Sequence, residues 1–214
     1  MLMSFASRQD AGQQLGHHLL NEGVHVDLVV GLPRGGVVVA AEVAHVLHAP
    51  LDILVVRKIG HPLHREFAVG ALAENDVVLL DEHALGPNET AHVMVSEVIR
   101  EEQERLAQYK GKFHQHHEID FCDKAVLIVD DGLATGRTME AAVMAARRKG
   151  TREVVVAVPV ASRTAIATLE RVTNGVYALI IDPGFEAVGA YYESFSQTSD
   201  EEVVQLLRAE HAQQ

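Results

Sequence analysis

Apolar positions along the chain follow two periods, which predict alternating helices and strands. Segments with helical spacing are 8–21, 35–49, 88–109, 136–150, 162–174 and a last one that begins after Ser199. Short apolar runs, typical of strands, are 27–32, 51–56, 67–72, 76–82, 124–131, 153–160 and 175–181. Strands that are apolar throughout and separated by helices form parallel sheets buried on both faces. The sequence therefore predicts an α/β fold, a doubly wound, mostly parallel sheet flanked by helices.

Two regions depart from this alternation. The strands at 67–72 and 76–82 have no helix between them, so they predict a hairpin. The helix at 88–109, capped by Asn88, is amphipathic and highly charged. Its charged face is either solvated or forms an interface with a second copy of the chain, so both a monomer and a homodimer are consistent with the sequence. Because no repeat or linker divides the chain, we expect one domain over residues 1–214.

Composition and charge exclude several classes of protein. Hydrophobic residues make up 48% of the 214 residues, which is typical of a globular rather than a disordered chain. The formal net charge of -12 argues against a nucleic-acid partner, whose phosphates would repel the protein. No apolar run approaches the length of a membrane span. The single cysteine, Cys122, and an N-terminus without a signal-peptide core favour a cytoplasmic location.

The thirteen histidines do not predict a metal site. The densest group is His114, His116 and His117, and neither a cysteine nor a helical pair of histidines accompanies it. We interpret this group as part of a solvated loop. His17 and His18 lie on the first amphipathic helix and receive the same interpretation.

The candidate chemistry lies at the ends of three predicted strands. The sequences there are LPRGG, RKIGHPLHRE and DDGLATGRT. Open α/β sheets bind ligands beyond the carboxyl ends of their strands, so we expect these three loops to meet at one edge of the sheet.

The loop GLATGRT at 132–138 has the properties of a phosphate site. Gly132 and Gly136 permit a tight turn with exposed amides, and the hydroxyls of Thr135 and Thr138 add donors at a helix N-terminus. The spacing fits neither a Walker A loop nor a dinucleotide GxGxxG loop. We therefore expect this loop to hold a single terminal phosphate.

Asp130 and Asp131 precede this loop, and a sugar phosphate explains the combination. Carboxylates accept hydrogen bonds from vicinal hydroxyls and can bind Mg²⁺ directly or through water. A ribose 5-phosphate could place its phosphate in the loop and its hydroxyls against the acids. Taken alone, the acid pair is equally consistent with a polar strand end that caps a helix.

The string from Val126 to Thr138 resembles the phosphoribosyl pyrophosphate (PRPP) signature of the type I phosphoribosyltransferases. The resemblance implies that family's fold, with a small hood beside the sheet. It also implies that Asp130 and Asp131 bind the ribose, and Mg²⁺, as catalytic residues. The 5-phosphate loop would consist of Gly132, Leu133, Ala134, Thr135, Gly136, Arg137 and Thr138.

The segment GLPRGG at 31–36 resembles the pyrophosphate loop of the same family. That loop would consist of Pro33, Arg34, Gly35 and Gly36. The Arg34 guanidinium can pair with pyrophosphate oxygens, whereas the alternative is an ordinary turn. Because the family often has a non-proline cis peptide here, we predict a cis bond between Pro33 and Arg34.

The segment VRKIG at 56–60 resembles the basic stretch that follows the family's second core strand. It implies that Arg57 and Lys58 are catalytic residues that stabilise charge on pyrophosphate. The following HPLHREF at 61–67 would be a mobile, hood-like loop that excludes water. The alternative is a solvated basic turn.

The hood would come from the N-terminal segment and from 182–198. A loose similarity to 6-oxopurine transferases implies that Phe185 stacks on a base and that Glu193 helps hold a second Mg²⁺. Tyr191 and Tyr192 also carry flat rings that could bind the base, unless they pack in the core of the hood. Those transferases have an acid at the position of Ala134, and alanine cannot transfer a proton, so the acceptor base stays open.

The sequence is therefore most consistent with a Mg²⁺-dependent phosphoribosyltransferase. Its partners would be PRPP and a nitrogenous base, with no nucleic acid and no membrane. One alternative is a non-catalytic regulator that binds PRPP or a nucleotide on the same fold. A phosphohydrolase that uses Asp130 as a nucleophile is disfavoured, because the additional lysine and acids that it needs are not evident.

Overall fold

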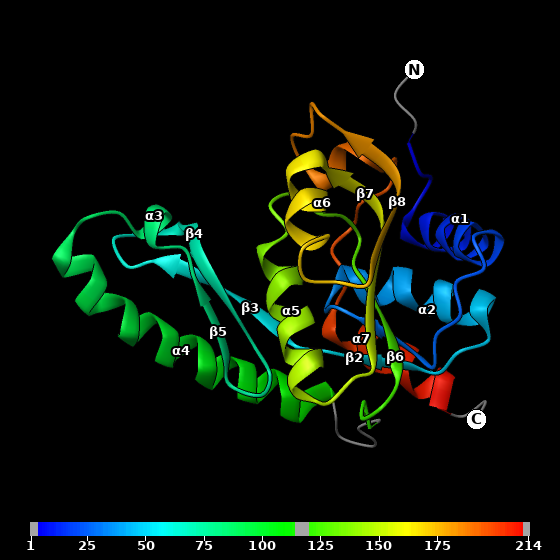
Figure 1. The fold of residues 1–214 in the computed structure, drawn as a ribbon, viewed down its shortest axis with the longest axis horizontal. Helices are drawn as coiled ribbons and strands as arrows, with labels where there is room; N and C mark the ends of the chain where they lie inside the picture. The colour runs from blue at the N-terminus through cyan, green and yellow to red at the C-terminus, as the bar shows by residue number, and fades with distance from the viewer. Residues whose placement is uncertain (1–3, 114–119, 212–214) are drawn as a thin grey trace.

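The computed structural model describes residues 4–113 and 120–211, which form a body and a projecting arm (Figure 1). Five parallel strands form the sheet of the body, in the order β2-β1-β6-β7-β8. They are β1 (Leu28–Gly31), β2 (Leu51–Ile53), β6 (Ala125–Val129), β7 (Glu153–Ser162) and β8 (Gly175–Asp182). This arrangement confirms the predicted α/β fold.

Helices cover both faces of this sheet (Figure 1). On one face lie α1 (Arg8–Asn21), α2 (Gly35–Leu47) and α7 (Asp200–His211). On the other lie α5 (Arg137–Arg148) and α6 (Arg163–Leu169). The side chains of β6 alternate between the two cores: Leu127 and Val129 face the first, and Val126 and Ile128 face the second. All five residues of β6 are buried, as expected for a central parallel strand.

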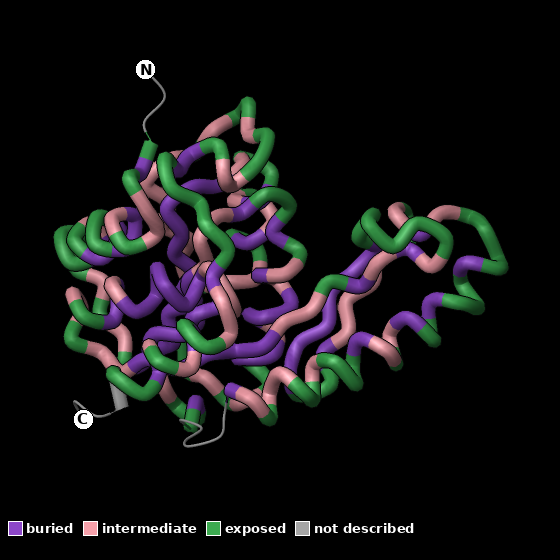
Figure 2. The backbone as a smooth tube through the Cα atoms, turned by 180° about the vertical axis from the view of Figure 1, so that it is seen from behind, coloured by how far each residue is buried: buried purple, intermediate pink, exposed green. Residues whose placement is uncertain are grey.

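The arm contains an antiparallel sheet in the order β3-β4-β5, covered by one long helix. Its elements are β3 (Val56–His61), β4 (His64–Ala73), β5 (Val77–Leu80), α3 (Glu82–Leu85) and α4 (Glu89–Phe113). The predicted hairpin is thereby confirmed as β4 and β5. Figure 2 shows the buried residues continuing from the body into the root of the arm, while the tip is mostly exposed.

The basic stretch at 56–60 is a strand of the arm rather than a turn at the end of a sheet strand. The predicted strand at 51–56 divides, because β2 ends at Ile53 and β3 leaves the body at Val56. The segment 61–67, expected to be a mobile loop, forms a short turn and the start of β4. The reason is tertiary: the apolar stripe of α4 supplies the surface against which this sheet packs.

Helix ends agree with the capping signals in the sequence. The Oδ1 atom of Asn88 accepts hydrogen bonds from the amides of Thr90 and Ala91 at the start of α4. Ser199 and Glu202 bond to each other's amides before α7, as in a capping box. The short 3₁₀ helix η1 (Val188–Tyr191) lies within the segment 182–198, which is called the hood below.

The structure bears in part on the predictions about the membrane and the histidine group. No helix in the part of the chain that the structure describes is long and apolar enough to cross a membrane. The histidine group at 114–117 lies outside the described residues.

Candidate functional site

Asp130 and Asp131 lie at the carboxyl end of β6, beside the loop that follows β1. The two strands are neighbours, and the order of connections reverses between them, which is where open α/β sheets bind ligands. A Cβ atom on Gly36 would come within 2.6 Å of Asp130 Oδ1, and one on Gly35 would collide with Asp131 Oδ2. Glycine at both positions therefore lets the 31–36 loop touch the acid pair.

A cavity of about 410 Å³ opens at this edge of the sheet. It brings together the loop after β1, the loop after β6 and the beginning of β3. The residues that line it are Pro33, Val56, Arg57, Lys58, Asp130, Asp131, Gly132, Leu133, Ala134, Thr135, Gly136, Thr138, Met139 and Val188. Residues from all three segments singled out in the sequence thus lie at one site, although the first segment contributes Pro33 alone.

The acid pair is half-buried and electrostatically costly. Burial raises the pKa of Asp130 well above its usual range, and the neighbouring Asp131 carboxylate raises it further, while Lys58 and Arg8 partly offset this effect. Burial also raises the pKa of Asp131, against the opposing hydrogen bond from Arg8. Hydroxyl donors or a cation at this position would stabilise the charged form of both acids.

Contacts that the sequence did not predict hold Asp131 in place. Arg8 Nε donates to Asp131 Oδ2 at 2.8 Å, and the Arg8 guanidinium lies 3.9 Å from the centre of the Phe195 ring. Arg8 Nη1 also donates to the carbonyl of Ser196. The Tyr192 hydroxyl donates to the backbone carbonyl of Asp131 at 2.6 Å. No sequence pattern around Arg8 indicates this role, because its partners are far away in the chain.

The 132–138 loop is anchored to β7 and leads directly into α5. The amide of Leu133 donates to the carbonyl of Val160, and the amide of Ser162 donates to the carbonyl of Leu133. Gly136 precedes the helix with a φ of 78°, a conformation that favours glycine. The first amides of α5 have no partner within the helix and point to its N-terminal end, where an anion would bind.

The side chain of Arg137 turns away from this loop. Its Nη2 atom donates to Asp81 Oδ2 at 2.9 Å, and its Nη1 atom to Glu140 Oε2 at 3.1 Å. Because Asp81 follows β5, this pair connects the body to the arm. Arg137 is thus the one residue of the predicted phosphate loop that does not line the cavity.

The three predicted basic residues differ in their surroundings. The peptide bond between Pro33 and Arg34 is cis, as predicted, and Arg34 Nη1 lies 3.7 Å from Asp200 Oδ1. Arg57 bonds to Glu102 on α4, whereas the side chain of Lys58 makes no hydrogen bond or ion pair with another described residue. A second cavity of about 280 Å³ shares Pro33, Val56 and Arg57 with the first and is also lined by Arg34, Val55 and Tyr109. Sequence analysis missed the two acids that pair with these arginines.

The aromatic residues proposed for base binding lie mostly in the core of the hood. Tyr191 and Tyr192 are buried, and neither lines the cavity. Burial and a hydrogen bond to Asp182 raise the pKa of Tyr191 to about 12. Phe185 stacks on Tyr191 with 5.5 Å between ring centres and stays half-buried. Packing of the hood, the alternative stated above, therefore describes both tyrosines better than contact with a base.

Two carboxylates at the cavity fit a magnesium ion that substrate oxygens help to hold. Mg²⁺ commonly binds one or two carboxylates together with waters and substrate phosphates. Among the described residues no group of three or more His, Cys, Asp or Glu side chains could hold a metal ion. Glu193 is exposed and interacts with Ser4, so it lies outside the cavity. The fit rests on Asp130 and Asp131, whose raised pKa values a cation would oppose.

Comparison with known proteins identifies similar chains. Residues 9–187 match the family described as phosphoribosyl transferase domain. A Mycobacterium tuberculosis protein of strain H37Rv, provisionally named phosphoribosyl transferase Rv0571c, is 39% identical over 208 residues and 97% of this chain. MT0597 of strain CDC 1551 matches equally and has the same provisional name. The chain spans about half the length, 47%, of these curated relatives.

Solved structures extend the similarity to the fold. The crystal structure of TT1426 from Thermus thermophilus matches with a TM-score of 0.79 and 39% identity, over 96% of this chain and 98% of that chain. AQ2163 from Aquifex aeolicus matches with a TM-score of 0.50 and 12% identity, over 82% of this chain and 74% of that chain. At 12% identity, the similarity to AQ2163 concerns the fold alone.

Proposed function

The chain belongs to the phosphoribosyl transferase domain family, and we propose that it moves ribose 5-phosphate from PRPP to a nitrogenous base, with Mg²⁺ bound and with release of pyrophosphate. The observation that carries the proposal is the convergence of three segments on the 410 Å³ cavity. The 132–138 loop offers helix amides and hydroxyls, the end of β6 offers two acids, and the beginning of β3 offers Arg57 and Lys58.

Each part of the cavity suits one part of PRPP. The 132–138 loop would bind the 5-phosphate through the amides at the start of α5 and the hydroxyls of Thr135 and Thr138. Asp130 and Asp131 would accept hydrogen bonds from the ribose hydroxyls. Pyrophosphate would lie towards Pro33 and Arg57, where the two cavities meet.

The reaction would break the bond between C1 of the ribose and a pyrophosphate oxygen while the base nitrogen attacks C1. Positive charge develops on the ribose and negative charge on the leaving group. Arg34, Arg57 and Lys58 would stabilise the leaving charge, while the fixed acids orient the ribose. Mg²⁺ held beside the acids would neutralise further charge on the pyrophosphate oxygens. Ala134 supplies no proton transfer, so another group or water must take the proton of the base.

A direct test measures pyrophosphate release from PRPP with Mg²⁺ across a panel of purine and pyrimidine bases. We expect release with one base or one class of bases. Asp131→Asn should reduce turnover strongly with little loss of fold, because it removes a ribose ligand and the charge that orients Arg8. Normal turnover in this variant would remove the role proposed for Asp131.

The alternative is a regulator that binds PRPP or a nucleotide without transferring it. Two observations favour it: Arg34 and Arg57 each pair with an acid of the protein, and the hood tyrosines are packed away from the cavity. Val188 is then the one residue of the segment 182–198 that lines the cavity. Mg²⁺-dependent PRPP binding without pyrophosphate release from any base would select the regulator.

A further inference from the structure

Helix α4 carries a glutamate on its buried face. Ala91, Val95 and Val98 pack against the sheet of the arm at helical spacing, and the next position on this stripe is Glu102. Only 6% of its surface is exposed. Because a buried carboxylate is costly unless it is paired, its partners indicate why it is there.

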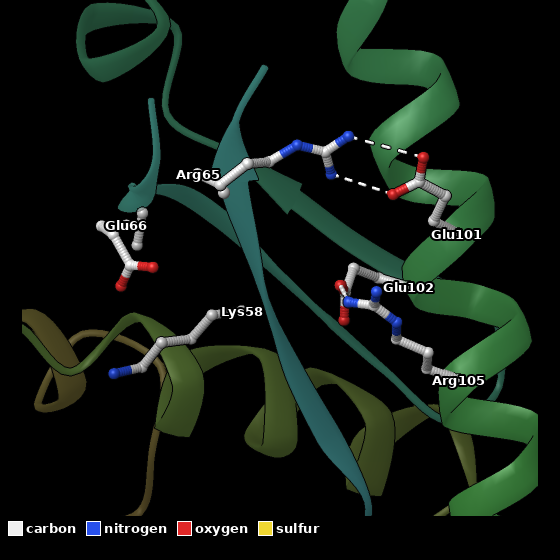
Figure 3. Close-up of a pocket in the computed structure, with 8 residues that line it drawn as sticks. Lys58, Arg65, Glu66, Glu101, Glu102 and Arg105 are labelled. Carbon is white, nitrogen blue, oxygen red and sulfur yellow. Dashed lines mark hydrogen bonds and ion pairs between the residues drawn. The ribbon is translucent and has the colours of Figure 1, made fainter. Parts of the chain in front are cut away.

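The partners of Glu102 are two arginines. Its Oε2 atom accepts from Arg57 Nε at 2.9 Å and lies 2.8 Å from Arg57 Nη2. Its Oε1 atom accepts from Arg105 Nη1 at 2.5 Å. Figure 3 shows Arg105 reaching Glu102 from the same helix, while the neighbouring Glu101 pairs with Arg65 of the hairpin. Both oxygens of the Glu102 carboxylate are therefore occupied.

Arg57 is fixed by α4 on one side and faces the cavities on the other. Its guanidinium also lies 5.4 Å from the centre of the Tyr109 ring, two turns further along α4. A guanidinium has five N–H donors. Glu102 engages Nε and Nη2, which leaves Nη1 and one N–H of Nη2 without a hydrogen-bond partner among the described residues. Arg57 can thus bind Glu102 and a phosphate group at the same time.

We infer that Glu102 is a positioning residue that holds Arg57 ready for pyrophosphate, so that the arm helix completes the anion subsite. This inference rests on the proposed function and names a residue outside the sequence motifs. The opposite role would be that Glu102 occupies Arg57 and prevents it from binding pyrophosphate. The geometry favours positioning, because Arg57 lines both cavities and keeps N–H donors that Glu102 does not engage. The ligand class is a diphosphate, either free or as part of PRPP.

The test compares Glu102→Gln with Glu101→Gln. Glutamine keeps the size of the side chain but loses the charge, so Arg57 and Arg105 both lose their anionic partner, and one of them also loses its hydrogen-bond acceptor. Glu101 is a matched control, since it is one residue away and pairs with Arg65 instead. We expect Glu102→Gln to lower kcat about tenfold with an unchanged KM for the base, and Glu101→Gln, which breaks an exposed pair, to stay within about twofold. Inorganic pyrophosphate should bind Glu102→Gln about tenfold more weakly in calorimetry.

A double-mutant cycle separates positioning from general packing. If Glu102 acts through Arg57, then Arg57→Ala combined with Glu102→Gln should be no worse than Arg57→Ala alone. Arg57→Lys, which keeps the charge without the planar fork, should resemble Glu102→Gln and serves as the second variant if that protein folds poorly. Thermal unfolding of each variant reports on folding.

The outcomes distinguish the two proposals. Losses that add in the double variant, equal effects of Glu101→Gln and Glu102→Gln, or tighter pyrophosphate binding by Glu102→Gln would overturn the inference. Absence of pyrophosphate release by the unaltered protein would overturn the transferase proposal alone, provided that pyrophosphate binding still depends on Glu102. A protein that binds no pyrophosphate would overturn both.

Discussion

Strands β6 and β4 are both rich in apolar residues, yet they lie in very different surroundings. β6 is buried along its whole length between two layers of helices. β4 is buried only in its second half, from Val69 to Ala73, while His64 to Ala68 are exposed. The central strand of the body therefore carries its acids on a rigid support, whereas the outer half of the arm has fewer buried contacts and a lower expected local stability.

This difference has a consequence for the site. The groups proposed to hold the ribose and the 5-phosphate come from the body, at the end of β6 and the start of α5. The groups proposed for the leaving pyrophosphate include Arg57 and Lys58 at the root of the arm. The groups proposed for binding and for leaving-group stabilisation thus come from two regions. At the root of the arm, Ala71, Ala73 and Val77 pack in the core of the body, whereas further out the arm has its own core against α4.

The largest effect is expected for Asp130→Asn in the body. We predict a loss of turnover of at least about 100-fold, because the change removes a proposed ligand to the ribose. The same change should raise the free energy of unfolding at pH 7. Desolvation raises the pKa of Asp130, so above that pKa the folded protein contains a charge that is partly removed from water, whereas the same charge is hydrated in the unfolded chain.

The stabilisation should depend on pH in a defined direction. As the pH falls through the raised pKa towards the ordinary value of 3.8, the folded carboxyl takes up a proton and the advantage of asparagine disappears. At pH 7 we expect a higher Tm for Asp130→Asn than for the unaltered protein, and at pH 4 a smaller difference. Thermal melts at pH 7 and pH 4, with the exposed Asp76→Asn as control, measure this. A lower Tm at pH 7 would show that the charge of Asp130 stabilises the fold.

The next effect concerns the core of the arm. Leu72→Ala should cost about 2–4 kcal/mol, because Leu72 is 1% exposed in the core between the arm sheet and α4. Hydrogen exchange should accelerate in 56–113 and remain slow in β6 and β7, if the arm opens separately. Leu63→Ala, at a half-exposed turn residue, should change little. Equal acceleration throughout the protein would mean that body and arm unfold as one unit.

A smaller effect is expected in the hood. Tyr192→Phe removes the hydrogen bond to the carbonyl of Asp131 and should cost about 1 kcal/mol. KM for the base should stay unchanged, because the ring packs in the core of the hood. Tyr177→Phe is the control, since the Tyr177 hydroxyl makes no hydrogen bond with another described residue. A rise in KM for the base in Tyr192→Phe but not in Tyr177→Phe would mean that Tyr192 contacts the base, as the sequence predicted.

The smallest effect is expected for the ion pair that joins body and arm. Arg137→Gln removes the bond to Asp81, in which both side chains are partly exposed, and should cost about 0.2–1 kcal/mol, less at high salt. PRPP affinity should stay within about twofold in calorimetry. A tenfold loss of affinity would mean that the Arg137 side chain turns towards the phosphate when PRPP binds.

The same two regions differ in how far the sequence predicts them. Local signals specify β6 and the acids and loop that follow it. These signals are the apolar run, Gly136 at positive φ and the helix that begins at Arg137, so the arrangement could be predicted. The strands of the arm were harder to place, because β3 is a strand only through its pairing with β4 and its packing against α4. Arg8 and Glu102 were missed because each contacts its partner across a long sequence separation, which one sequence does not encode locally.

The most direct test of the central claim is calorimetric titration of PRPP into the protein, with and without Mg²⁺ and with pyrophosphate as competitor. The account predicts one PRPP per chain, tighter binding with Mg²⁺, displacement by pyrophosphate, and weak binding to Asp130→Asn. Absence of PRPP binding, or binding that neither pyrophosphate nor Asp130→Asn affects, would contradict the placement of a PRPP site at the end of β6.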